Sequence, residues 1–304
     1  MHIEKALDFI YQHGRSECDA FDVVAGVYAS SGISVFQGKL KDTEISNSSG
    51  IGVRVFRNGC PGYAFTESLE ENALKQMFAD AISHTEFTQI LPIELPKPTL
   101  PGCEREHYHP EVENCSFEQM KELCLSIEKL SLASPEIENV PYLGSGKSVS
   151  QIYLMNSNGI SYSRQSSHLS TSVGVVACRN SVKKLGVYSQ VVFDVKDFDG
   201  NKIATKAVEK AKSLLGARSI ASGNYPVIFS EEISGNVISM YASSFSADSV
   251  QKGNSRLKGL MNTQIASPCF TLLNDHTRMD LPGFATFDGE GVPTQNIEMV
   301  EKKK

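Results

Sequence analysis

The sequence predicts an α+β protein in which two similar helix/β-meander/helix units are followed by a mainly β C-terminal domain. Three observations predict this fold. Apolar residues recur at helical spacing at the start and end of each unit, an Asn-Gly pair marks a tight turn inside each unit, and a proline-rich stretch separates them. Sequence identity between the two units is low, so the duplication is inferred from the order of elements.

The first unit is predicted to occupy residues 1–90. It opens with a helix that has one apolar face, formed by Ile3, Leu7, Ile10 and Tyr11. A β-meander follows from about residue 21 to residue 65, with its tight turn at Asn58-Gly59. A second helix, from about residue 69 to residue 86, closes the unit.

Residues 91–115 are predicted to be a linker that runs over the surface. Neither a helix nor a central strand can pass through its prolines, which are Pro92, Pro96, Pro98, Pro101 and Pro110. The same stretch contains a cluster of possible metal ligands, Cys103, His107, His109 and Cys115. Their spacing does not match the common zinc arrangements, so we interpret them as a chance cluster on a solvated loop.

The second unit is predicted at residues 116–221 and repeats the order of the first. Its helix begins at Ser116, where Gln119 completes a capping box. Strands follow from about residue 149 to residue 194, and a helix from about residue 201 to residue 215 ends the unit. Residues 144–148 (Gly-Ser-Gly-Lys-Ser), just before these strands, resemble the end of a phosphate-binding loop. Pro141 stands where that motif needs glycine, so we expect a hairpin connection instead.

The third region, residues 222–304, begins with a predicted amphipathic helix over residues 230–249. Its buried face would contain Ile233, Val237, Met240, Tyr241 and Phe245. Near the end lies the acidic loop, residues 287–295 (Phe-Asp-Gly-Glu-Gly-Val-Pro-Thr-Gln). Its glycines permit positive φ and Pro293 fixes its exit, so as structure this loop holds a turn between strands.

The composition is that of an ordinary soluble domain. Of 304 residues, 40% are hydrophobic and 21% charged, the formal net charge is −6, and no apolar run is long enough to span a membrane. The acidic balance argues against direct nucleic-acid binding, which needs a concentrated basic surface. Seven scattered cysteines do not suggest a disulfide framework. We therefore expect a cytoplasmic protein that binds neither membrane nor nucleic acid.

Three segments carry a resemblance to a known family: residues 50–55 (Gly-Ile-Gly-Val-Arg-Val), residues 225–253 and the acidic loop. In this order they resemble the TldD/PmbA family, bacterial and archaeal proteins linked to peptide processing and genetically to DNA gyrase. The chain looks most like the PmbA (TldE) branch. Family members usually continue past the acidic loop, so the resemblance implies a C-terminally truncated chain with a C-terminal domain of the TldD/PmbA type that lacks partner strands.

The resemblance also implies that the catalytic zinc site of the TldD branch is missing. That site uses His-Glu-x-x-x-His on the helix after the strand matching residues 225–229. If Lys252-Gly253 is aligned with the Lys-Gly that ends this helix, the ligand and glutamate positions hold Ile238, Ser239 and Ser243. Isoleucine and serine do not replace the nitrogen, sulfur or carboxylate ligands that zinc needs. We therefore expect no catalytic residue, metal ligand or bound cofactor in this chain, and zinc in a TldD-like partner.

The function implied is that of a non-zinc PmbA/TldE-like subunit of a cytoplasmic TldD/TldE-type metallopeptidase complex, acting in proteolysis and peptide maturation. This subunit would complete the peptide-binding cavity, and Asp288, Glu290 and Thr294 of the acidic loop could contact peptide or the other subunit. The expected partners are a TldD-like zinc-bearing paralogue and peptide substrates, with a homo-oligomer also possible. The alternatives are a non-enzymatic interaction protein of the DNA gyrase modulator type, or a degenerate truncated remnant of the family.

Overall fold

The computed structural model describes residues 2–92, 94–99, 107–276, 278, 281 and 284–301. The chain divides into two compact structural units, and the first of them contains both helix/β-meander/helix units predicted above. The first contains Met1–Ala217 together with Ala285–Thr294, and the second contains Arg218–Phe284 and Gln295–Lys304. The segment that carries the acidic loop therefore packs with the first unit, although the sequence places it in the third region.

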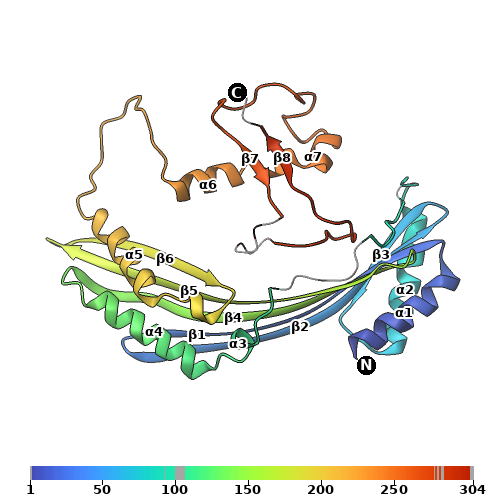
Figure 1. Ribbon diagram of the computed structural model, residues 1–304, viewed down its shortest axis with the longest axis horizontal. Helices are drawn as coiled ribbons and strands as arrows, with labels where there is room; N and C mark the ends of the chain where they lie inside the picture. The colour runs from blue at the N-terminus through green and yellow to red at the C-terminus, as the bar shows by residue number, and fades with distance from the viewer. Residues whose placement is uncertain are drawn as a thin grey trace. The chain divides into compact units, whose positions relative to one another are not determined.

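The first unit is built on one antiparallel sheet of six strands in the order β3-β2-β1-β4-β5-β6 (Figure 1). The strands are β1 (Ala20–Phe36), β2 (Lys39–Arg57), β3 (Cys60–Thr66), β4 (Ile137–Asn156), β5 (Ser161–Arg179) and β6 (Val182–Val192). The helices are α1 (Ile3–Glu17), α2 (Glu71–His84), η1 (Thr85–Phe87), α3 (Pro110–Glu113), α4 (Phe117–Leu132), η2 (Val195–Asp197) and α5 (Gly200–Ser213). The predicted order of helix, meander and helix is thus confirmed twice, and the pairing of β1 with β4 joins the two meanders into a single sheet.

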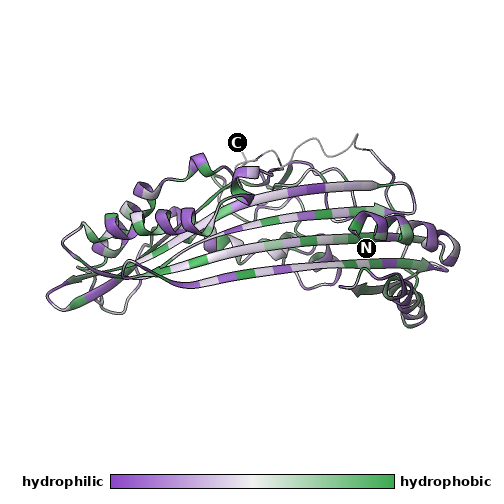
Figure 2. Ribbon diagram, turned by 90° about the horizontal axis from the view of Figure 1, so that it is seen from below, coloured by the Kyte–Doolittle hydropathy of each residue, from purple (hydrophilic) through white to green (hydrophobic). Residues whose placement is uncertain are grey.

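Each half of the sheet has its own hydrophobic core. In the first half, α1 and α2 bury residues such as Phe21, Val23 and Phe78. In the second half, α4 and α5 bury residues such as Val173 and Ile203. Apolar and polar residues alternate along the strands, as the bands of colour in Figure 2 show. The capping box predicted at Ser116 and Gln119 is present at the start of α4.

One face of the sheet is covered by these helices, and we call the other face the open face. In β1 the odd-numbered residues Val23 and Ala25 are buried under helices, whereas the even-numbered Val24 and Tyr28 are exposed. Because successive side chains of a strand point to opposite faces, the even-numbered residues of β1 lie on the open face.

Two glycines let a helix of each half approach the sheet closely. A Cβ atom at Gly62 of β3 would lie 1.9 Å from the carbonyl oxygen of Ala81 in α2. A Cβ atom at Gly186 of β6 would lie 2.3 Å from the backbone of α5, at Ala207. The two halves thus use the same device, a glycine in the last strand of the meander, to seat the closing helix.

The beginning of the second meander differs from the prediction. β4 begins at Ile137, not near residue 149, so the Gly-Ser-Gly-Lys-Ser segment lies inside this strand. The predicted hairpin connection is wrong because these residues pair with β1 on one side and with β5 on the other. A Cβ atom at Gly144 would lie 2.9 Å from the carbonyl oxygen of Ile33, so the glycine reflects close backbone packing between strands.

The passage over residues 91–115 is tied to the second meander. The side-chain amide of Asn156 donates to the carbonyl of Pro96 (2.8 Å), and that of Asn158 donates to the carbonyl of Leu95 (2.7 Å). Proline stands at the first turn of α3, where its missing N–H costs nothing, and Val112 of this helix is fully buried. Cys103, part of the possible ligand cluster, lies outside the described residues.

The second unit contains α6 (Glu231–Ser239), η3 (Ala242–Phe245), α7 (Ala247–Gln251), β7 (Leu272–Asn274) and β8 (Ile297–Val300). The single helix predicted over residues 230–249 is wrong, since it is divided into three short pieces. Met240 and Tyr241, assigned to its buried face, are 76% and 62% exposed. Most helical stability in proteins comes from packing of the apolar face, and these residues lack that support. Residues 225–229 are not a strand here.

None of the helices in the described part of the chain is long and apolar enough to cross a membrane.

Candidate functional site

The acidic loop is a compact turn stabilised by its own polar groups. One carboxylate oxygen of Asp288, Oδ1, accepts hydrogen bonds from the backbone N–H groups of Glu290 and Val292, both at 2.9 Å. The backbone N–H of Asp288 donates to the carbonyl of Val292 (2.9 Å). The hydroxyl of Thr294 donates to the carbonyl of Ala285, which closes the base of the turn. Asp288 and Thr294 therefore shape the loop from within.

Aromatic packing attaches this loop to the second half of the sheet. Phe287 is only 2% exposed and forms a small core with Leu154, Ile160 and Tyr162. The centroids of the Phe287 and Tyr162 rings are 5.3 Å apart. Gly291 has a φ of +88°, and a Cβ atom there would lie 2.8 Å from Cδ1 of Ile160. Glycine is thus required both by the backbone conformation and by the close approach to β4 and the turn that follows it.

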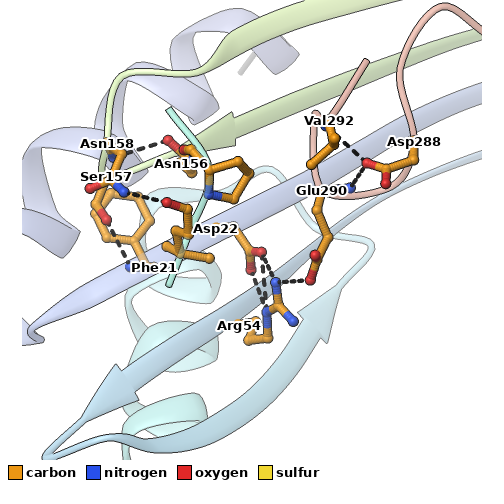
Figure 3. Close-up of polar contacts among 11 residues, drawn as sticks. Phe21, Asp22, Arg54, Asn156, Ser157, Asn158, Asp288, Glu290 and Val292 are labelled. Carbon is orange, nitrogen blue, oxygen red and sulfur yellow. Dashed lines mark hydrogen bonds and ion pairs between the residues drawn. The ribbon is translucent and has the colours of Figure 1, made fainter. Parts of the chain in front are cut away.

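An ionic cluster attaches the loop to the first half of the sheet (Figure 3). Arg54 of β2 lies opposite Asp22 of β1 in the strand register. Its Nε donates to both carboxylate oxygens of Asp22, at 3.0 and 3.1 Å, and its Nη2 also donates to Asp22. The same Nη2 donates to Oε1 of Glu290 at 2.7 Å. Arg54 therefore bridges a carboxylate of the sheet and a carboxylate of the loop, in the planar geometry that guanidinium groups favour.

Burial makes this cluster interdependent. The side chains of Arg54 and Asp22 are 15% and 12% exposed, whereas that of Glu290 is 46% exposed. Burial raises the pKa of Asp22 above its ordinary value, and the hydrogen bonds and charge of Arg54 oppose this rise. Burial would lower the pKa of Arg54, but its hydrogen bonds to Asp22 and Glu290 raise it overall. Arg54 consequently stays charged and favours the ionised form of Asp22 against the effect of burial.

A cavity of about 510 Å³ lies beside the ionic cluster on the open face. Its wall contains Asp22, Val24, Gly52, Val53, Arg54, Tyr63, Ala64, Phe65, Gly289 and Glu290. Phe65 and Tyr63 are largely exposed, so the cavity combines apolar surface with one outward-facing carboxylate, that of Glu290. A site of this composition binds through apolar contacts and a few polar groups.

The three loop residues predicted from the sequence therefore occupy different positions. Glu290 lines the cavity, whereas Asp288 and Thr294 form hydrogen bonds within the loop. Whether they contact peptide or a subunit remains a prediction. The sequence analysis missed the roles of Asp22 and Arg54. Arg54 lies within residues 50–55, which carried part of the family resemblance, but nothing in the sequence indicated its pairing with a loop more than two hundred residues away.

The three residues that the resemblance aligned with the zinc motif lie in the second unit. Ile238 and Ser239 are at the end of α6, and Ser243 is in η3, after the break in the helix. The hydroxyl of Ser239 donates to the carbonyl of Asn236 at 2.8 Å. These three side chains do not fit a zinc ion, since they offer no imidazole, thiolate or carboxylate. Within the residues that the structure describes, no group of three or more His, Cys, Asp or Glu side chains is placed to hold a metal.

The open face also contains a titratable group, His168 of β5, next to Ser148 of β4 in the register. Burial lowers the pKa of His168, and burial together with His109 lowers that of His107. These histidines therefore take up protons at a higher pH in the unfolded chain than in the folded chain. Their contribution to the free energy of unfolding is complete above the ordinary histidine pKa and decreases as the pH falls below about 6.5. We expect urea unfolding to give a lower free energy at acidic than at neutral pH, and His168→Gln to reduce this difference. An unchanged difference in that variant would contradict the assignment to His168.

Comparison with protein families decides the classification of the chain. Models of the PmbA/TldA metallopeptidase family match three consecutive segments: domain 1 at residues 21–84, the central domain at residues 110–215 and the C-terminal domain at residues 222–302. The chain belongs to the PmbA/TldD family. The resemblance predicted from the motifs is confirmed, and the family is one of metallopeptidases.

Individual relatives of this PmbA/TldD chain are distant but extensive. A metalloprotease from Methanothermobacter thermautotrophicus is 26% identical over 286 residues, which cover 92% of this chain and 62% of the relative. A metalloprotease from Haemophilus influenzae, a PmbA homologue, is 23% identical over 317 residues, covering 97% of this chain and 66% of the relative. The chain thus spans just under two thirds of the length of these relatives.

Solved structures confirm the fold of the PmbA/TldD chain. A protein from Thermotoga maritima described as a DNA gyrase modulator superposes with a TM-score of 0.89 at 20% identity, covering 99% of this chain and 69% of that one. TldE from Thermococcus kodakarensis superposes with a TM-score of 0.82 at 18% identity, covering 98% and 68%. The predicted α+β fold of the TldD/PmbA type is therefore confirmed.

Proposed function

We propose that this chain is the non-zinc subunit of a TldD/TldE-type metallopeptidase. A zinc-bearing TldD-like paralogue would supply the metal, and this chain would complete the surface that binds extended peptides. The proposal is supported by the match of three segments to the family, together with the presence of Ile238, Ser239 and Ser243 where the resemblance places the zinc motif. A member without zinc donors contributes to catalysis only together with a partner that has them.

The role of the cavity beside the acidic loop follows from its composition. Phe65 and Tyr63 offer apolar surface for a peptide side chain, and Glu290 offers a carboxylate to an N–H group or a cationic side chain. Asp22 holds the opposite side of Arg54, so the ion pairs fix the position of Glu290. We propose that this cavity contacts the peptide without taking part in the chemical step.

The test is coexpression of the chain with its His-Glu-x-x-x-His paralogue, followed by cleavage assays on unfolded fluorogenic peptides. Activity is expected only in the mixed preparation, and a chelator should abolish it. Phe65→Ala should raise KM by about fivefold with little change in kcat, since it removes apolar contact worth about 1 kcal/mol from substrate and transition state alike. The matched control is Phe87→Ala, because Phe87 is equally exposed (84% against 81%) and lies outside the cavity.

Two results would contradict the subunit role, and a third would contradict the role of the cavity. Activity of the isolated chain that resists chelators would indicate an independent peptidase. Two chains that neither associate nor show activity together would favour a non-enzymatic interaction protein or a family remnant. A KM that rises equally in the Phe65 and Phe87 variants would remove the cavity from peptide binding while leaving the subunit role open to the association result.

A further inference from the structure

The two edges of the six-stranded sheet differ in how they are protected. β2 extends beyond β3, so its residues 39–50 have one unpaired side. This edge contains Lys41, Asp42 and Glu44, and charged side chains are a common device against unwanted strand pairing. At the opposite end of the sheet, β6 is paired with β5 alone.

The turn between β5 and β6 shows which groups of β6 face outward. Arg179 and Val182 are partners across a turn of two residues, Asn180 and Ser181, both with positive φ. Residues that flank such a turn form a hydrogen-bonded pair, so the even-numbered residues of β6 direct their backbone groups at β5. The odd-numbered residues Lys183, Leu185, Val187 and Ser189 direct theirs outward. Among the described residues, no backbone hydrogen bond reaches these outward groups.

Apolar side chains accompany this edge on the open face. Leu185 and Val187 are 44% and 43% exposed. Leu185 and Tyr142 both lie over Gly174 of β5, because a Cβ atom at this glycine would meet Tyr142 at 3.1 Å and Leu185 at 3.5 Å. Lys183 forms an ion pair with Glu138 of β4, so its charge is already matched. Lys184, the other charged residue of β6, is even-numbered and lies opposite Ala177 on the helix-covered face. On the open face this edge therefore presents Leu185 and Val187 beside a lysine whose charge is matched.

A row of lysines accompanies the same edge on the helix-covered face. α5 lies on β6 at Gly186, and its Lys202, Lys206 and Lys210 follow each other at intervals of four residues, which places them on one side of the helix. The other side, which includes Thr205 and Glu209, lines a cavity with α4. Glu209 forms an exposed ion pair with Lys206 (3.6 Å), so the charges of the row are partly matched. The Nζ atom of Lys210 lies 5.6 Å from the ring centroid of Tyr188 in β6. The row therefore runs along the outer border of the sheet.

We propose that the outer edge of β6 binds an extended polypeptide segment with alternating acidic and apolar residues. Such a segment would add a seventh strand through main-chain hydrogen bonds. Its apolar side chains would lie beside Leu185 and Val187, and its acidic side chains beside the lysine row. A second copy of this chain fits less well, since pairing two β6 edges around a twofold axis would bring two lysine rows together. The proposal concerns the isolated chain and does not depend on the proposed function.

The experiment is a fluorescence anisotropy titration of a labelled octapeptide of alternating valine and glutamate with the full chain. Saturable binding is expected, and a valine-lysine octapeptide should bind about tenfold more weakly, a difference of about 1.4 kcal/mol. Methylation of alternate peptide nitrogens on the side that faces β6 should abolish binding, because it removes the hydrogen-bond donors. Lys206→Glu should weaken binding by about threefold, within the range of exposed ion pairs.

Two proline variants locate the binding edge. Val187→Pro removes an outward N–H of β6, and Asn47→Pro removes an outward N–H of the β2 edge as the matched control. Only the first should lose binding, with both chains folded by circular dichroism. Val187→Lys tests the same edge by charge if the proline variant does not fold. No saturable binding, equal binding by Val187→Pro and Asn47→Pro, or equal binding of the methylated peptide would overturn the proposal.

Discussion

Replacement of Arg54 by methionine is expected to destabilise the chain by about 3–5 kcal/mol, because it leaves the Asp22 carboxylate buried without its counterion. Burial already raises the pKa of Asp22 with Arg54 present, so loss of the guanidinium should drive this group to take up a proton. The ionic attachment of the acidic loop would be lost at the same time, since Arg54 also holds Glu290. Urea unfolding measures the first effect, and hydrogen exchange over residues 285–294 measures the second.

Further variants separate the ion cluster from a general effect of removing charge. Arg57→Met, at an exposed position of the same strand, should change stability by no more than about 0.5 kcal/mol. Glu290→Gln should cost only about 1 kcal/mol, because its side chain is 46% exposed. Asp22→Asn combined with Arg54→Met should recover part of the loss. If the double variant is as unstable as the sum of the two single variants, Asp22 and Arg54 are not coupled.

The second large effect is expected for Gly62→Ala. The added methyl group would lie 1.9 Å from the carbonyl oxygen of Ala81 and 2.9 Å from the backbone nitrogen of Thr85, so α2 must move away from β3. Backbone atoms cannot relieve this clash by a change of rotamer, as a side chain could. We therefore expect the free energy of unfolding to fall by about 3 kcal/mol. Thermal unfolding followed by circular dichroism gives the measurement.

A glycine with free space around it supplies the control for this substitution. Gly216→Ala introduces a methyl group with no atom within 4 Å and should leave stability nearly unchanged. Gly186→Ala should resemble Gly62→Ala, because the same contact recurs between β6 and α5. If Gly62→Ala is as stable as the unchanged chain, α2 can move away from β3 without loss of stability. Glycine would then not be required at this contact.

Local patterns in the sequence predict the elements of residues 1–217 well. The capping box at Ser116 and the Asn-Gly turns are local signals, and each is present where expected. The start of β4 was not predictable in this way, since Gly144 and Gly146 look like a loop and are held in the sheet by partners on both sides. The long helix predicted over residues 230–249 failed for the reverse reason, because its apolar face is not packed.

The candidate site was predictable only in part. The acidic loop is evident from its glycines and carboxylates, and the carboxylate that lines the cavity, Glu290, was among the residues selected. Its partners were not, because Arg54 and Asp22 meet it through strand register and chain folding, which no local pattern encodes. Sequence spacing indicated which residue types were available, and the tertiary contacts determined which of them came together.

The central pairing of β1 with β4 has a consequence for synthesis of the chain. β1 ends at Phe36, and its partners in β4 span Gly144 to Asn156, so more than a hundred residues must be added before this edge of β1 can pair. At an elongation rate of about 10 residues per second this interval is roughly ten seconds. During that time the first meander emerges from the ribosome with its future centre exposed. The middle of the finished sheet thus remains an unpaired edge of the first meander until β4 has been made, and the nascent chain needs protection there during this interval.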